Sequence, residues 1–383
     1  MVYDRAFHVA VANGAVFYGS SADDKVYCLD AETGHVLWSF FTEGPVRLAP
    51  TVSAYRVYVG SDDGCAYCLD ARSGGLLWKR RISPEDRRIS GNGRMISVWP
   101  VRTGVLVERG VAYCCAGLFP NEGVYVSALN ASDGSVLWMK KTDGASLQGY
   151  LLASETRLFV PTGRTAPAIF DRKDGRYLGE FGVQGGAFAL VADDVLVSGP
   201  GRTTGQVEMA DVNTRESIAS FNGLHMVVRR GTAYLHTKTS IAALDRFRHL
   251  KLTRERNALV RRKEELQKQL ARAKAERKRE QIETVGDAIS QVNKRLEVIP
   301  REMHECFLWL RPCSCPYSLI LAGDTLFAGG DSAVAAFSTA DGEELWRSAV
   351  EGRAYGLAVA DGRLFVSTDR GAIHCFTSRG SRP

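Results

Sequence analysis

A nine-residue motif recurs in this chain and constrains its fold more than any other feature. Four segments align without gaps in the pattern (Asp/Asn/Ser)-x-x-x-Gly-x-x-x-Trp, at residues 30–38, 70–78, 130–138 and 338–346. Each follows two or three apolar runs rich in β-branched and aromatic residues. Asn-Gly, Asp-Gly or Thr-Gly pairs separate these runs, as tight hairpins require. Each unit therefore predicts four short antiparallel strands, which we name A to D.

Further copies of the unit extend the repeat over most of the chain. Degenerate copies lie at about residues 158–181, 195–221 and 233–309, and a last copy near residues 357–376 lacks strand D. A four-stranded unit repeated about every forty residues is typical of a β-propeller. The sequence thus predicts an all-β, eight-bladed propeller of four-stranded antiparallel blades, the last one incomplete.

The tryptophan that ends the motif is large enough to fill the space between adjacent blades. We assign this structural role to Trp38, Trp78, Trp138, Trp309 and Trp346. In two degenerate copies, Phe181 and Phe221 lie near the tryptophan position.

A helical insertion interrupts the sixth blade between strands C and D. Arg, Lys, Glu, Gln and Ala, all good helix formers, dominate residues 246–300. Leucine or alanine recurs every seven residues from 252 to 273, and aliphatic residues from 282 to 299 are spaced three and four apart. The two frames do not match, so we predict a turn between residues 273 and 280 and an antiparallel coiled-coil hairpin. The predicted organisation is propeller at 1–245, hairpin at 246–304 and propeller again at 305–383.

The positive charge of the chain belongs to this insertion. Residues 246–304 hold 17 Lys and Arg against 9 Asp and Glu, whereas the rest holds 32 basic and 34 acidic residues. A basic projecting hairpin predicts a docking arm for a protein or an anionic surface, and a solvated coiled coil without a partner is the alternative. Nucleic acid is not favoured, because glutamates alternate with the basic residues and no aromatic residues accompany them.

The strand order predicts which loops share a face of the propeller. D-to-A and B-to-C loops emerge on one face, while A-to-B and C-to-D loops, with the hairpin, emerge on the other. The arginine-rich connection at residues 79–99 covers the first face, which receives the entrances of all the innermost A strands. Polar and aromatic residues near these entrances are candidates to bind an acidic ligand or peptide, or they are ordinary channel residues bridged by water: Arg47, Trp99, Arg102, Gln148, Tyr150, Gln184, His225, Tyr317, Arg353 and Tyr355.

Nine cysteines, an odd number, argue against a disulfide framework and favour a reducing compartment. Cys65 and Cys68 have metal or redox spacing, but in one strand their side chains point to opposite faces. His304 and Cys306 lie at the other end of a strand from Cys313 and Cys315, so one shared zinc site is excluded. Cys313 and Cys315 by themselves remain a candidate redox pair.

The motif resembles the tryptophan-docking repeats of the pyrroloquinoline-quinone (PQQ) propeller superfamily. That superfamily includes quinoprotein alcohol dehydrogenases and the non-enzymatic lipoprotein of the outer-membrane β-barrel assembly machine. Cys114 and Cys115 resemble the adjacent-cysteine pair near the cofactor in some of these dehydrogenases. No convincing set of Glu, Asn and Asp matches their calcium-and-base arrangement, so no catalytic residue is assigned and no cofactor is expected. PQQ with calcium is the alternative.

These features predict a non-enzymatic scaffold for protein–protein interaction, with a polar axial funnel and a coiled-coil arm. The first alternative is a PQQ- or quinone-binding oxidoreductase or sensor, and the second is a propeller module of a larger enzyme. The sequence has no apolar segment long enough to span a membrane and no signal peptide. It therefore predicts a cytoplasmic protein if the chain is complete, and an extracytoplasmic one if it is an excerpt.

Overall fold

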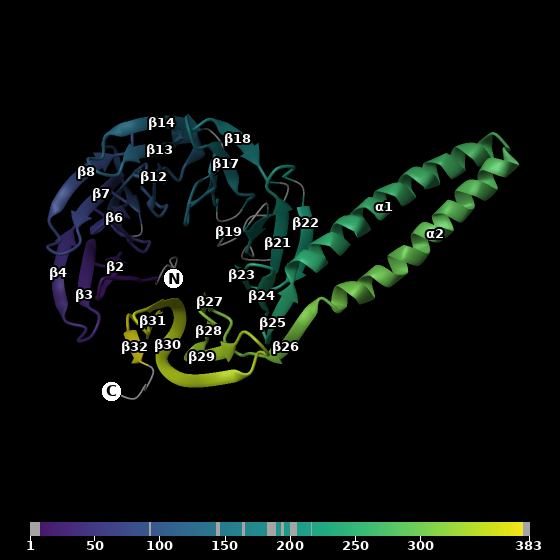
Figure 1. Cartoon of the computed structure of the whole chain (residues 1–383). Helices are drawn as coiled ribbons and strands as arrows, with labels where there is room; N and C mark the ends of the chain where they lie inside the picture. The colour runs from purple at the N-terminus through teal and green to yellow at the C-terminus, as the bar shows by residue number, and fades with distance from the viewer. Residues whose placement is uncertain are drawn as a thin grey trace.

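The structure is a ring of antiparallel β-sheets from which two long helices project (Figure 1). It is a computed structural model that describes residues 8–91, 93–142, 146–162, 165–181, 189–192, 195–199, 205–215 and 217–377. Successive sheets follow one another around a central axis, and each begins with its innermost strand. The predicted all-β propeller with an inserted helical hairpin is confirmed.

Six four-stranded sheets form the first six blades, and within each the strands pair in chain order. Blade 1 comprises β1 (Ala10–Ala12), β2 (Ala15–Ser20), β3 (Lys25–Asp30) and β4 (Val36–Phe41). Blade 2 comprises β5 (Thr51–Ser53), β6 (Arg56–Gly60), β7 (Cys65–Asp70) and β8 (Leu76–Arg81). Blade 3 comprises β11 (Leu106–Glu108), β12 (Val111–Ala116), β13 (Val124–Asn130) and β14 (Val136–Thr142). Blade 4 comprises β15 (Leu152–Ala153), β16 (Arg157–Val160), β17 (Ala168–Asp171) and β18 (Tyr177–Glu180). Blade 5 comprises β19 (Ala189–Ala192), β20 (Val195–Ser198), β21 (Gln206–Asp211) and β22 (Ser217–Asn222). Blade 6 comprises β23 (His225–Arg229), β24 (Thr232–His236), β25 (Ser240–Asp245) and β26 (Phe307–Pro312).

Blades 7 and 8 share one continuous strand. Blade 7 comprises β27 (Ser318–Ala322), β28 (Thr325–Gly329), β29 (Asp331–Ser338) and the first part of β30 (Glu344–Ala360). Blade 8 comprises the second part of β30, then β31 (Arg363–Thr368) and β32 (Ile373–Thr377). The described strands thus form seven four-stranded units and one three-stranded unit. Eight closed blades stay a prediction, because residues 1–7 and 378–383 lie outside the described residues.

The motif tryptophan of one blade packs on the motif glycine of the next blade. The Trp38 indole N–H donates to the carbonyl oxygen of Ala71 at 3.0 Å, and a β-carbon added at Gly74 would lie 2.6 Å from the Trp38 ring. The same arrangement joins Trp78 to Gly134, Trp138 to Gly175 and Trp309 to Gly342. Only a residue without a side chain fits beneath the indole, and each glycine has a positive φ. The predicted docking role is therefore realised by these four tryptophans.

Trp346 departs from this arrangement. It is 36% exposed, compared with 7% for Trp78, and it packs edge-on against Phe376 at 5.0 Å between ring centroids. Blade 8 offers no described motif turn on which this indole could dock.

Between degenerate blades 4 and 5 the sizes of the two docking residues are reversed: a glycine stands at the tryptophan position, and a large residue stands at the motif-glycine position of the next blade. In blade 4 the tryptophan position is Gly179, two residues before Phe181. In blade 5 the motif-glycine position is Arg215, which has φ of 65° and a guanidinium that lies over Gly179. The tryptophan position of blade 5 is Ala219, which pairs with Met209, and Phe221 lies two residues further along β22. Phe181 and Phe221 are thus near, but not at, the tryptophan positions.

Two antiparallel helices, α1 (Arg246–Ala275) and α2 (Arg279–His304), make up the insertion. The Asp245 side chain caps α1 by accepting a hydrogen bond from the Arg248 backbone N–H. The chain reverses at residues 276–278, within the predicted turn region, and Arg277 there has φ of 56°. The predicted seam residues face inward: Leu252, Leu266, Ala273 and Ile299 are buried, and the remaining seam positions are half-buried.

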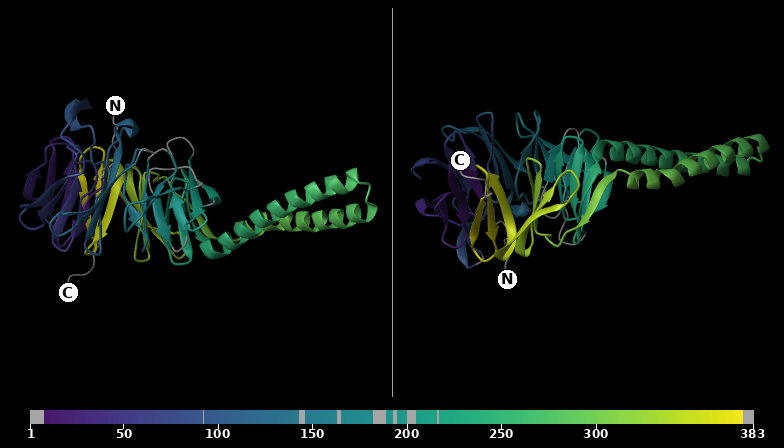
Figure 2. Two further views of the ribbon diagram at one scale, coloured as in Figure 1. Left: turned by 90° about the horizontal axis from the view of Figure 1, so that it is seen from above. Right: turned by 60° about the horizontal axis from the view of Figure 1, so that its bottom comes forward.

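The base of the hairpin belongs to the propeller core. Leu250, Leu252 and Ile299 pack in one cluster with the side chains of blades 5 and 6. The Arg246 side chain is 1% exposed and donates to the backbone carbonyls of Ala192 and Arg230. The hairpin is therefore rigidly rooted. It extends outward from the ring rather than along the axis (Figure 2).

Replacing a docked tryptophan should cost more stability than replacing the exposed one. Trp78→Ala removes an indole buried between two blades and its hydrogen bond, so we expect a loss of about 3–5 kcal/mol in the free energy of unfolding. Trp346→Ala should cost less than half as much, because that ring is already 36% exposed. Equilibrium denaturation of both variants measures the difference, and equal losses would contradict the docking account.

Candidate binding face and inserted arm

The buried carboxylate of Asp62 organises the first face of the propeller. Asp62 lies in the B-to-C loop of blade 2, is fully buried, and accepts two hydrogen bonds from Arg102, both at 3.0 Å. The Arg47 Nε atom donates to the same carboxylate at 2.6 Å. Two arginine side chains therefore share this carboxylate, and Asp63 beside it is a second buried carboxylate.

Tyr150 lies beside this arginine pair. Its hydroxyl accepts a hydrogen bond from the Ala49 backbone N–H at 2.9 Å, and its ring packs edge-on against His8 at 5.7 Å. Tyr150 is 38% exposed, and a β-carbon at Gly104 would clash with its ring. The ring therefore connects the entrances of blades 1, 2 and 3 while keeping an open surface.

A second group of predicted residues gathers where blades 6, 7 and 8 begin. The Tyr317 and Tyr355 rings lie 5.0 Å apart, and the Arg353 guanidinium lies 5.7 Å from the Tyr317 ring centroid. His225 interacts with the backbone of Pro316 and Tyr317. The His8 ring also lowers the pKa of His225.

Two of the predicted funnel residues have structural roles, and one cannot be assigned. Trp99 is 3% exposed, packs between blades 2 and 3 and donates to the Glu122 carbonyl oxygen, so it does not line an open funnel. The Gln148 amide donates to the backbone of Thr162. Gln184 lies outside the described residues.

The arginine-rich connection before blade 3 forms a hairpin of β9 (Arg88–Gly91) and β10 (Arg94–Ser97). Its arginines are paired with neighbouring acids: Arg88 with Glu43 at 3.0 Å and Arg94 with Asp24 at 2.8 Å. These ion pairs hold the hairpin over blades 1 and 2. It covers part of the first face, as predicted, but its charge is neutralised within the fold.

Three histidines are held in their neutral form by their surroundings. Burial lowers the pKa of His225, His236 and His249 to about 4 in each case. His236 is fully buried, and its Nε2 atom lies 3.1 Å from the Cys313 sulfur. Protonating any of these rings would place an unbalanced cation inside the protein.

Adjacent Cys114 and Cys115 point to opposite sides of β12. Cys114 packs in the cluster between blades 2 and 3, and Cys115 packs in the cluster between blades 3 and 4. Burial raises the pKa of Cys114 to about 11 and that of Cys115 well above its usual value. The strand geometry does not suit a bond between these sulfurs. Cys65 and Cys68 likewise belong to different clusters.

Cys313 and Cys315 do lie together, just after β26. A hydrogen bond from Cys313 and the nearby Arg347 guanidinium lower the pKa of Cys315, while the same bond and burial raise the pKa of Cys313. Both thiols are buried, at 3% and 0% exposure. His304 and Cys306 stand at the opposite end of β26, as predicted.

Within the part of the chain that the structure describes, no three His, Cys, Asp or Glu side chains are placed to hold one metal ion. The buried carboxylate of the first face, Asp62, is already bound by two arginines. A dication placed there would compete with both guanidinium groups.

Sequence reasoning missed Asp62, His8 and His236 as members of this face and its surroundings. Asp62 stands outside the repeated motif, in the segment Ser61-Asp62-Asp63-Gly64. The sequence did offer one signal for Asp62. It belongs to a pair of acidic residues in one B-to-C loop, on a face where the other predicted residues are rich in arginine.

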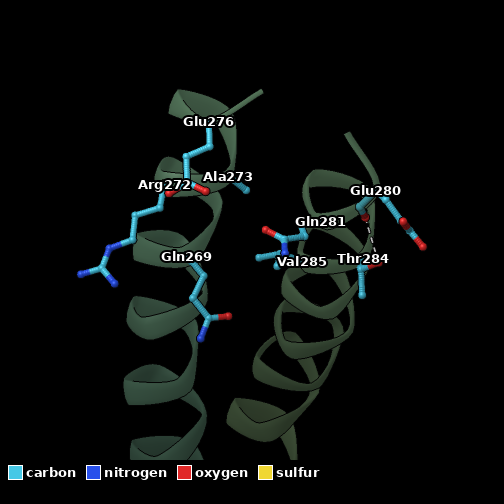
Figure 3. A pocket seen from close by; sticks show the side chains of 8 residues that line it. All are labelled: Gln269, Arg272, Ala273, Glu276, Glu280, Gln281, Thr284 and Val285. Atoms are coloured by element: carbon cyan, nitrogen blue, oxygen red, sulfur yellow. Dashed lines mark hydrogen bonds between the residues drawn. The ribbon is translucent and has the colours of Figure 1, made fainter. Parts of the chain in front are cut away.

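The distal part of the arm is strongly basic and projects away from the ring (Figure 1). The cluster that joins arm and propeller includes no α1 residue beyond Leu259 and no α2 residue before Ile299. Residues 261–279 hold nine basic and three acidic side chains. Near the tip the helices enclose an open cleft of about 620 Å³ (Figure 3), lined by Gln269, Arg272, Ala273, Glu276, Glu280, Gln281, Thr284 and Val285.

Known proteins share parts of this sequence and this architecture. The sequence model of a family described as outer membrane protein assembly factor BamB matches residues 5–113 and 330–382. No curated protein matches by sequence. Among solved structures, BamB from Moraxella catarrhalis is 12% identical, with a TM-score of 0.61 over 98% of this chain and 97% of that one. The computationally designed Ika8 protein is 11% identical, with a TM-score of 0.64 over 97% and 95%. A quinohemoprotein alcohol dehydrogenase from Pseudomonas putida HK5 is 14% identical, with a TM-score of 0.59 over 94% and 68%.

The repeated motif, the sheet order and these similarities define the class of fold. The chain has a β-propeller fold with a helical hairpin inserted in one blade, and its matched segments are similar to the BamB family of PQQ-like repeat propellers. Among the described residues, no helix is long and apolar enough to cross a membrane.

Acidification should destabilise the protein through the buried histidines. Their pKa is about 4 in the folded protein and about 6.5 when unfolded, so between these values the unfolded chain binds more protons. Stability is therefore fully present above pH 6.5 and falls with pH, by about 1 kcal/mol per histidine and pH unit.

Denaturation at pH 7 and pH 5 measures this loss. His236→Gln should show a smaller loss between the two pH values than the unchanged protein, whereas His35→Gln, at an exposed position, should match it. A stability independent of pH in this range would contradict the assignment.

Proposed function

We propose that this propeller is a non-enzymatic scaffold for protein–protein interaction, with the basic arm as its main docking element. The axial face, with its Arg47–Asp62–Arg102 group and exposed Tyr150, is a second binding surface. The BamB family match supports a propeller scaffold of this kind.

This proposal depends on one observation: the arm is rooted at its base in the propeller and projects beyond the ring (Figure 1). Its base is part of the core of blades 5 and 6, so its direction is fixed. Arg295 of α2 binds Glu255 of α1 at 2.6 Å and Glu302 at 2.9 Å, which stiffens the lower half of the helix pair. A rigid arm can present a surface to a partner with little loss of conformational entropy on binding.

The charge of the arm indicates the chemistry of the partner. Arg262, Lys268, Arg272 and Lys274 are exposed along distal α1. Residues 280–299 of α2 hold four acidic and two basic residues, so the positive surface belongs to α1 and the tip. An acidic protein surface is the partner that this distribution favours.

A quinone-binding oxidoreductase or sensor is the second candidate, because a quinohemoprotein alcohol dehydrogenase shares the fold. The positions of Cys114 and Cys115 and the occupied Asp62 carboxylate weigh against it. Two proteins that share a fold do not for that reason catalyse the same chemistry. Cys313 and Cys315 remain a candidate redox pair under either proposal.

Two observations point to different compartments. All nine cysteines are free thiols in the structure, which suits a reducing environment, whereas the matched family is described as an outer membrane protein assembly factor.

Shortening the arm should abolish partner binding and spare the propeller. The cut must leave Leu259 and Ile299 in place, so we would replace residues 264–291 with a short Gly-Ser linker that spans the roughly 10 Å between the helices. A fluorescent poly-glutamate peptide serves as the acidic probe, and fluorescence anisotropy measures its binding.

We expect the intact protein to bind this probe in a salt-dependent manner and the shortened variant to bind at least tenfold more weakly. The triple variant Lys268→Glu, Arg272→Glu, Lys274→Glu keeps both helices and should lose binding equally, while Lys268→Arg should not. Unchanged binding by the shortened protein would refute the arm as the docking element.

Calorimetric titration with PQQ and calcium tests the second candidate. We expect no saturable heat, because the buried carboxylate of the face is already bound by two guanidinium groups. Saturable binding that requires calcium would overturn the scaffold proposal in favour of a quinoprotein.

A further inference from the structure

A chain of four polar side chains crosses the seam between blades 6 and 7. His236 ends β24 of blade 6, and Arg347 belongs to the part of β30 in blade 7. Cys313 and Cys315 lie in the connection that follows β26. The His236 Nε2 atom lies 3.1 Å from the Cys313 sulfur, and the Arg347 Nη1 atom donates to the Cys315 sulfur at 3.6 Å. A hydrogen bond between the two thiols completes the chain.

The backbone allows the sulfurs of Cys313 and Cys315 to bond to each other. Both side chains pack in one cluster, whereas the two members of each other candidate cysteine pair belong to different clusters. The α-carbons of residues two apart are separated by at most about 7 Å, close to the upper limit for a disulfide. Cys313 and Cys315 lie outside the strands, so a slight bend of the connection brings them within bonding range.

The surroundings give the two thiols different properties. The hydrogen bond from Cys313 and the Arg347 guanidinium lower the pKa of Cys315, against the opposing effects of burial and of Glu344. The same hydrogen bond and burial raise the pKa of Cys313. Burial also raises the pKa of all four thiols in the other candidate pairs. Cys315 is therefore the one of these six thiols whose surroundings favour the thiolate, which is the nucleophilic form.

The His236 ring is placed to assist Cys313. The ring is fully buried, and its Nδ1 atom has no hydrogen-bond partner among the described residues. The Cys313 S–H donates to Cys315, so the His236 Nε2–H is the group that donates to the Cys313 sulfur. A donor aimed at this sulfur stabilises negative charge that develops there when the thiol loses its proton.

We propose that Cys313 and Cys315 form a dithiol that a hydroperoxide oxidises to a reversible disulfide. The Cys315 thiolate attacks one peroxide oxygen, so that an S–O bond forms while the O–O bond breaks. The hydroxide that leaves takes a proton from solvent, equal to the proton that Cys315 released, and Cys315 becomes a sulfenic acid. The Cys313 sulfur then attacks the Cys315 sulfur, so that the S–S bond forms while the S–O bond breaks.

The hydroxide that leaves in this second step takes the Cys313 proton. With hydrogen peroxide, two thiols thus lose two electrons and two protons in all, and the peroxide becomes two molecules of water. Arg347 and His236 act as positioning residues, because they stabilise charge on the two sulfurs without reacting themselves.

Burial of the pair favours a small oxidant. Cys313 and Cys315 are 3% and 0% exposed, but the Arg347 side chain that contacts Cys315 is 38% exposed. A single side chain therefore connects the sulfur to the surface, and a hydroperoxide needs less room than a bulky disulfide reagent. This inference goes beyond the proposed scaffold function and does not depend on the roles of the arm or of the axial face.

Mass spectrometry of the folded protein after treatment with hydrogen peroxide tests the proposal. The full chain carries Cys375→Ser, which removes the one exposed cysteine of the nine. We expect the protein to lose two hydrogen atoms, with the disulfide mapped to the fragment that holds Cys313 and Cys315. Dithiothreitol should reverse the loss. Cys114 and Cys115, an equally buried pair, are the internal control and should stay reduced.

Single substitutions separate the two roles. Cys313→Ser should leave a sulfenic acid on Cys315, which dimedone labels, because the resolving thiol is missing. Cys315→Ser should leave Cys313 unlabelled, because the attacking thiolate is missing. Circular dichroism before and after treatment shows that each variant stays folded.

The pH profile of disulfide formation tests the positioning role of Arg347. Arg347→Gln should slow the reaction at pH 7 at least about fivefold and move the profile to higher pH, because less of Cys315 is thiolate. Arg347→Lys keeps the positive charge and should restore most of the rate. A purely structural role of Arg347 would leave the profile in place.

Three results would overturn the proposal. One is a pair that stays reduced in the folded protein at peroxide concentrations that oxidise a free thiol. Another is dimedone labelling of Cys313 in Cys315→Ser. The third is a disulfide that forms to the same extent between Cys114 and Cys115, which would mean that the oxidation is not selective.

Discussion

The packing of an indole on a glycine of the neighbouring blade is the interaction on which this propeller depends. Each blade is a narrow antiparallel sheet, and its outer strand has few neighbours apart from the next blade. Trp38, Trp78, Trp138 and Trp309 bridge that gap with both apolar area and an indole hydrogen bond. Because the contact is one-directional, from the tryptophan of one blade to the glycine of the next, a change in one blade requires a matching change in its neighbour.

The irregular blades follow this rule. Where blade 4 has Gly179 in place of tryptophan, blade 5 has Arg215 in place of glycine, and the guanidinium fills the space. Where blade 6 replaces the motif turn with α1, blade 5 has Ala219 at the tryptophan position, and Phe221 packs on His249 of the helix instead. The arm is thus joined to the ring at a place where an indole dock is replaced by another contact.

The repeated part of the structure could be predicted from the sequence, and the unrepeated part could not. Glycine and tryptophan at fixed spacing predicted the strands, their order and the docking contacts, and heptad spacing predicted the arm with its turn. The Arg47–Asp62–Arg102 group joins loops of different blades, and no periodicity relates those positions. Trp99 resembled a funnel residue from its place in the chain, but its large apolar surface is buried between blades 2 and 3.

Amide hydrogen exchange tests the central claim, that indole docking holds neighbouring blades together, most directly. If it does, the outer strands of blades 1 and 2 should exchange slowly in the middle of the strand, because both have a docked tryptophan. The outer strand of blade 4, β18, should exchange faster, since Gly179 stands at its tryptophan position. Equal protection of β18 and of β8 would contradict the account, because it would show that the blades are held together without the dock.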